Sequence, residues 1–141
     1  LVAAALGRYG AVLRTPDDPT LLLRTDRPAR WVACSPDGTL LYAADTDGLS
    51  CWDIASAAAK WQLTSSAPIA SLAVHPSGAV LVGHAAGSVS AATSQGLTPI
   101  ITGLLGSVSS IAPTATELVL GASRDGTGSV SCWRLEHDNG Q

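Results

Sequence analysis

The sequence predicts an all-β fold built from repeated four-stranded antiparallel units, and three observations lead to this prediction. Residues 49–52, Leu-Ser-Cys-Trp, recur as Val-Ser-Ala-Ala at 89–92 and as Val-Ser-Cys-Trp at 130–133, at spacings of 40 and 41 residues. Each period contains short apolar segments separated by turn sequences such as Ser-Pro-Asp-Gly at 35–38. No stretch has the sustained 3.6-residue periodicity of a long helix.

The period from residue 27 shows the expected strands most clearly, at 31–34, 40–44, 49–53 and 60–63. Pro36 has the φ angle that the first turn position requires, and Gly38 can take the left-handed conformation at the end of that turn. Asp47 and Gly48 form a similar turn between the second and third strands. Residues 55–60 have a helix-forming composition but are too few for a stable helix, so we expect a loop.

The same pattern extends over the whole chain and predicts fourteen strands. Three are expected before Arg27 (residues 1–6, 11–15 and 21–25), four in each of the next two periods, and three in the last. The expected units are 1–26 (last strands of a preceding repeat), 27–65 (complete), 66–104 (degenerate) and 105–141 (lacking its last strand).

Composition excludes several classes of protein. Hydrophobic residues make up 46% of the 141 residues, which argues against disorder. The formal net charge of −3 provides no general attraction for nucleic acid or anionic membranes, and no apolar run is long enough for a membrane helix. Residues 1–6 lack the features of a signal peptide, so we expect the chain to begin inside a longer protein. Three cysteines form no disulfide framework, so the expected location is intracellular, most simply the cytoplasm.

The sequence contains no recognisable catalytic or metal-binding constellation. There is no Gly-x-Ser-x-Gly elbow, and the three histidines belong to no triad pattern. Residues 45–48 begin like a calcium-binding loop, but Ser56 stands where the bidentate glutamate would be required. Cys51 and Cys132 occupy equivalent repeat positions, where we expect buried, packed thiols. We therefore expect no catalytic residues, no metal and no cofactor.

These residues resemble the WD40-repeat β-propeller family over residues 27–141. The resemblance rests on the turn residues Asp37 and Gly38, the turn residues Asp47 and Gly48, the Trp52-Asp53 dipeptide, and Trp133. The sequence lacks the Gly-His pair that precedes the first strand in the family, and Ala43 and Ala44 stand in place of its Ser/Thr. Of the family's hydrogen-bonded tetrad, only Asp47 and Trp52 remain.

Three and a half such units are too few for a closed ring, because propellers typically have 4 to 8 blades. The resemblance therefore implies an incomplete ring, completed by further blades from the same longer chain or by a second copy.

By resemblance, the connections between blades and the turns at 45–48, 85–87 and 124–128 share the narrow face on which partners dock. The residues that we expect to contact a partner there are Arg24, Arg27, Arg30, Trp31, Asp45, Arg124 and Asp125. Arg and Trp are common at binding hot spots, and this cluster could engage an acidic peptide. The alternative for 124–128 is an exposed turn, two residues longer than the one at Asp47-Gly48.

The predicted function is a non-enzymatic scaffold that docks protein or peptide partners within a larger assembly. One alternative is the propeller domain of an enzyme whose catalytic or cofactor residues lie outside this segment. Another is a structural role in which residues 61–123, where Glu117 is the only charged side chain, form a permanent interface.

Overall fold

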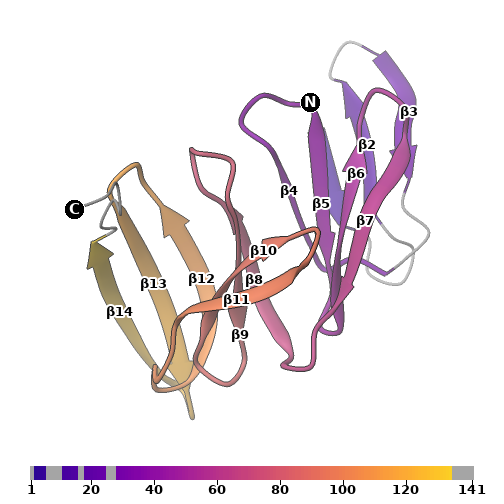
Figure 1. Ribbon diagram of the computed structural model, residues 1–141. Helices are drawn as coiled ribbons and strands as arrows, with labels where there is room; N and C mark the ends of the chain where they lie inside the picture. The colour runs from indigo at the N-terminus through magenta and orange to yellow at the C-terminus, as the bar shows by residue number, and fades with distance from the viewer. Residues whose placement is uncertain (1, 6–10, 16–17, 25–27, 135–141) are drawn as a thin grey trace.

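A computed structural model describes residues 2–5, 11–15, 18–24 and 28–134, and describes side chains from residue 28 onward. The described residues form fourteen strands in four antiparallel sheets, in which spatial order follows chain order (Figure 1). The first sheet contains β1 (Val2–Ala5), β2 (Ala11–Thr15) and β3 (Asp18–Arg24). The second contains β4 (Trp31–Cys34), β5 (Leu40–Ala44), β6 (Gly48–Asp53) and β7 (Ala58–Thr64). The third contains β8 (Ile69–Val74), β9 (Val80–His84), β10 (Val89–Thr93) and β11 (Gly96–Ile101). The fourth contains β12 (Ser107–Pro113), β13 (Glu117–Arg124) and β14 (Thr127–Arg134).

The sheets stand side by side in one row, from β1–β3 at one end to β12–β14 at the other (Figure 1). The first strands of successive sheets are neighbours: β1 lies against β4, β4 against β8, and β8 against β12. This arrangement of antiparallel meanders around a shared inner edge confirms the predicted all-β fold. The division into repeats at residues 26/27, 65/66 and 104/105 stays a prediction.

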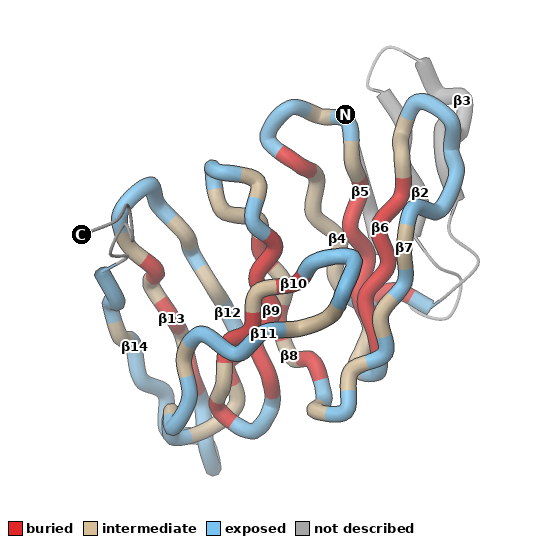
Figure 2. The backbone as a smooth tube through the Cα atoms, viewed as in Figure 1, coloured by how far each residue is buried: buried red, intermediate tan, exposed pale blue. Residues whose placement is uncertain are grey.

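The core lies between the sheets rather than within one of them. Leu49 and Cys51 of β6 pack against Ile69, Val80 and Val82 of the third sheet. The other face of the third sheet packs against the fourth through a cluster of buried aliphatic side chains, which comprises Leu81, Val89, Val108, Leu118 and Leu120. Figure 2 shows the buried positions concentrated on β5, β6 and β9, with further ones on β8 and β10. Each sheet thus depends on its neighbours for the burial of its apolar faces.

The turns between the first and second strands form as predicted. Gly38 and Gly78 have φ angles of 75° and 94°, in the region that favours glycine. The Ser35 hydroxyl donates to Asp37 at 2.6 Å and accepts from the amide of Leu40 at 3.0 Å, which fixes the first of these turns.

Two expectations about the fourth strand and the last hairpin are corrected. Strand β7 begins at Ala58, so the loop expected over 55–60 is shorter, and its Ala57 has a φ of 58°. The β13–β14 turn is not long: Arg124 pairs with Thr127, which leaves only Asp125 and Gly126 between the strands. Their φ angles of 50° and 79° fit a type I′ turn, so the additional residues lengthen the strands instead.

The expectation of a buried thiol is correct for Cys51 and wrong for Cys132. Cys51 is buried between the second and third sheets, and this burial raises its pKa. Cys132 is exposed, because no further sheet covers its face of β14 among the described residues. Its thiol donates a hydrogen bond to the Glu117 carboxylate, and that interaction raises the Cys132 pKa.

Candidate interaction surface

The ends of the sheets form two rims, and the first carries the connections from one sheet to the next. This connection rim comprises the turns at 45–48, 85–87 and 125–126, together with the connections at 65–68 and 102–106. Hydrogen bonds join turns to connections: Ser65 N to Asp47 O at 2.8 Å, and Leu104 N to Gly87 O at 3.0 Å. Gly87 has a φ of 94°, and a Cβ there would collide with the Leu104 carbonyl. The connection rim is therefore a surface whose backbone is held in place by hydrogen bonds.

A hollow of about 440 Å³ opens on the connection rim between the third and fourth sheets. Its lining comes from three segments, namely Ala85 and Ala86, Leu104 to Ser107, and Arg124 with Asp125. Leu105 is 76% exposed, a higher fraction than any other large hydrophobic residue with a described side chain except Val130. Arg124 Nε and Asp125 Oδ2 lie 3.8 Å apart, and both side chains are largely exposed. The hollow therefore combines an exposed apolar group with exposed charges of both signs.

The structure brings the expected partner-binding residues together in two groups on different sheets. Arg30 is exposed immediately before β4, and its amide donates to Ala44 O at 2.7 Å. Trp31 follows it, is half-buried, and packs against the cluster between the second and third sheets. Asp45 accepts the amides of Asp47 and Gly48 at 3.0 Å each, so its carboxylate stabilises the turn.

Arg124 and Asp125 form the second group, on the fourth sheet. The other two expected residues are not assigned to a group, because the Arg24 side chain and all of Arg27 lie outside the described residues.

Residues of the repeat signature have hydrogen-bonding or packing partners in the structure, among them Asp37, Asp53 and Trp52. Asp37 accepts hydrogen bonds from the Ser35 and Thr39 hydroxyls, which together lower its pKa to about 2. Asp53 accepts from the Ser56 hydroxyl and amide, and these bonds lower its pKa as well. Trp52 is buried against Leu41.

The serines that recur on the third strands have a hydrogen-bonding role that was not predicted from the sequence. Trp52 Nε1 donates to Ser50 Oγ at 2.9 Å, and Trp133 Nε1 donates to Ser131 Oγ at 3.0 Å. In the third sheet Ala92 replaces the tryptophan, and the buried His84 forms a 3.0 Å hydrogen bond to Ser90 instead. The signal was present in the sequence, because these three serines recur with the repeat period.

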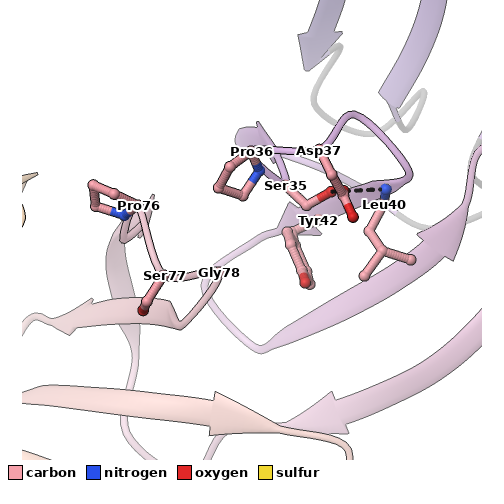
Figure 3. Close-up of a pocket in the computed structure, with 8 residues that line it drawn as sticks. All are labelled: Ser35, Pro36, Asp37, Leu40, Tyr42, Pro76, Ser77 and Gly78. Atoms are coloured by element: carbon pink, nitrogen blue, oxygen red, sulfur yellow. Dashed lines mark hydrogen bonds between the residues drawn. The ribbon is translucent and has the colours of Figure 1, made fainter.

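The opposite rim, formed by the turns at 35–39, 75–79 and 114–116, also has hollows between sheets. Figure 3 shows the one between the second and third sheets, where Ser35 and Asp37 lie across from Ser77. The next hollow, of about 330 Å³, is mainly apolar and is lined in part by His75 and Ile100. His75 Nδ1 accepts the Ser77 amide at 3.0 Å, whereas its buried Nε2 has no hydrogen-bond partner.

The described residues contain no group of three or more His, Cys, Asp or Glu side chains placed to hold a metal ion. They also contain no helix that is long and apolar enough to cross a membrane.

No protein-family model matches the chain, and no curated protein matches it. Solved structures do match. U3-55K aligns with a TM-score of 0.76 and 16% identity, over 94% of this chain and 45% of U3-55K. A structure of the mitotic checkpoint complex aligns with a TM-score of 0.74 and 17% identity, over 96% of this chain and 47% of the matched chain. The computationally designed Ika4 protein aligns with a TM-score of 0.72 and 16% identity, over 95% of this chain and 84% of Ika4.

These likenesses define the class of fold as a β-propeller, because they extend over nearly all of the four sheets. More particularly, the fold is WD40-like. The chain spans just under half the length of the first two matched chains, so it corresponds to an incomplete ring.

Proposed function

We propose that this chain is a non-enzymatic scaffold that docks a protein or peptide segment on its connection rim, as part of a larger assembly. The observation that carries the proposal is the exposure of Leu105 beside Arg124 in a hollow between two sheets. Its WD40-like fold and the resemblance to a structure of the mitotic checkpoint complex, which is a protein assembly, support protein partners in general terms.

The chemistry of the hollow favours a short segment with an apolar side chain next to an acidic one. The apolar side chain would cover Leu105 and remove its surface from water. The acidic side chain would approach Arg124, whose Nε is 3.8 Å from its own neighbour Asp125 and is therefore only weakly paired. Because the rim is held by backbone hydrogen bonds, little of the docking energy would be needed to order it.

Peptide selection tests the proposal without a known partner. The 141-residue chain is immobilised and presented with a phage-displayed library of random peptides. The wild type should enrich peptides with an aliphatic residue beside Asp or Glu. The double variant Leu105→Ser, Arg124→Glu should lose that enrichment.

Arg134→Glu is the matched control, because Arg134 is an exposed arginine at the far end of β14 from the connection rim. This variant should select the same peptides as the wild type. Enrichment that survives the double variant would show that the hollow is not the docking site.

A further inference from the structure

The outward face of the fourth sheet has the same arrangement of residues as the face of the third sheet that packs against the fourth. In the third sheet, Gly83 pairs with Ser71 on one side and Val89 on the other. In the fourth, Gly121 pairs with Ser110 on one side and Val130 on the other. The register shift before Ser71 also recurs before Ser110. These two sets of three residues are therefore equivalent positions.

The two faces differ sharply in exposure. Val89 is 0% exposed, whereas its equivalent Val130 is 80% exposed. Ser71 is buried, whereas Ser110 is exposed. Figure 2 shows β14 as an almost continuously exposed strand. Since the positions are equivalent, the difference arises because the fourth sheet lacks a following neighbour among the described residues.

The third sheet shows what such a neighbour provides. Ser71 Oγ donates a buried hydrogen bond to the Val108 carbonyl of β12 at 2.7 Å. Leu81 and Val89 pack against the Val108 side chain and its surroundings in the fourth sheet. Gly83 leaves room for this contact, because a Cβ there would collide with Ser71 Oγ and Val108. A Cβ at Gly121 would likewise collide with Ser110 Oγ. On the fourth sheet, Ser110, Gly121 and Val130 are placed for the same kind of contact, but no sheet among the described residues packs against them.

We infer that the β1–β3 sheet of a second copy of this chain covers the exposed face of the fourth sheet, and that two copies close a ring through two identical contacts. The first and fourth sheets stand at opposite ends of the row (Figure 1), and β1 lies at one edge of its three-stranded sheet, against β4. The chain follows the fold of propeller chains about twice its length over more than nine-tenths of its own residues. Two copies together have eight sheets, twice the four of one chain and within the 4 to 8 blades of closed propellers, and a head-to-tail contact that closes gives a finite assembly.

This inference goes beyond docking on the connection rim and does not depend on it, because it concerns another surface. Its test is the mass of the 141-residue chain in solution, measured by size-exclusion chromatography with light scattering over a range of protein concentrations. The wild type should have a mass of about 28 kDa, which is twice the 14.2 kDa of one chain. A wild type that stays at 14.2 kDa at every concentration would overturn the inference and leave the face for a further blade of a longer chain.

Substitutions locate the contact. Val130→Arg should give the single-chain mass, and circular dichroism should show an unchanged fold because Val130 is on the surface of one chain. Leu105→Arg is the matched control, since Leu105 is 76% exposed but lies on the connection rim, and it should leave the double mass intact. Ser110→Ala should weaken the pair about fivefold to 150-fold, because it removes one hydrogen bond from each of the two identical contacts.

Two outcomes would contradict the inference even if the chain associates. If Val130→Arg keeps the double mass, the contact lies on another surface. If the wild-type mass keeps rising with concentration beyond two chains, the contact does not close.

Discussion

His84 Nε2 and the Ser90 hydroxyl are joined by a buried hydrogen bond of 3.0 Å, at the place where the neighbouring sheets use a tryptophan. His84 Nδ1 also lies 3.2 Å from the Ala67 carbonyl, in the connection that enters the third sheet. This histidine therefore links the second and third strands to the connection rim. The third sheet keeps the serine on its third strand, Ser90 of β10. The partner of that serine is not a tryptophan on the same strand but His84 on the neighbouring strand β9.

Removing the Ser90 hydroxyl tests the importance of this link. Ser90→Ala should lower the free energy of unfolding by about 1–3 kcal/mol, because it leaves a buried imidazole nitrogen unpaired. Ser131→Ala removes the equivalent hydroxyl beside the partly exposed Trp133 and should cost less than about 0.5 kcal/mol. Urea denaturation followed by circular dichroism measures both. Equal losses would contradict the role assigned to His84.

Trp52 should contribute most to stability among the repeat signature residues. Trp52→Ala should lower the free energy of unfolding by about 3–5 kcal/mol, because the buried side chain leaves a cavity beside Leu41. Trp133→Ala should cost less than half as much, since Trp133 is 39% exposed. A near-neutral Trp52→Ala variant would contradict the packing of the second sheet.

The sequence predicted the strands of the second sheet well, because turn residues mark their ends. Strands β4 and β5 have the expected bounds, since Pro36 and Gly38 restrict the hairpin between them to one geometry. The last hairpin was harder to predict: Asp125-Gly126 forms a two-residue turn, and only the pairing of the whole strands shows where the additional residues go.

The sites were less predictable than the strands. Whether Cys132 is buried depends on whether another sheet covers it. Its position in the repeat, which is the same as that of Cys51, therefore did not predict that it is exposed. Leu105 was missed because nothing in its local sequence distinguishes an exposed leucine from a buried one.

Asp37 should make stability depend on pH in the acid range. Hydrogen bonds from Ser35 and Thr39 lower its pKa from 3.8 to about 2, so the folded state favours the ionised carboxylate. The resulting stabilisation is fully present above about pH 4 and is lost as the pH falls towards 2. Urea midpoints measured from pH 5 to 2 should fall less steeply for Asp37→Asn than for the wild type. A constant difference between the two proteins would contradict this prediction.

The arginines before β4 should influence docking if the partner extends to that end of the connection rim. Reversing Arg27 and Arg30 to Glu should weaken binding of an acidic peptide, and should reduce the salt dependence of that binding. Arg30 is exposed, so the substitution should not disturb the sheet. Fluorescence anisotropy with a labelled peptide from the selection measures both effects. Unaltered affinity would restrict the site to the hollow beside Leu105.

We expect partners to dock on the connection rim, and mapping a selected peptide by nuclear magnetic resonance shows directly where the peptide binds. The peptide is titrated into the ¹⁵N-labelled chain, and the amide shifts are followed residue by residue. We expect the largest changes at residues 85–87, 104–107 and 124–126, which surround the hollow. Changes centred instead on residues 75–79 and 114–116, at the opposite rim, would contradict the claim.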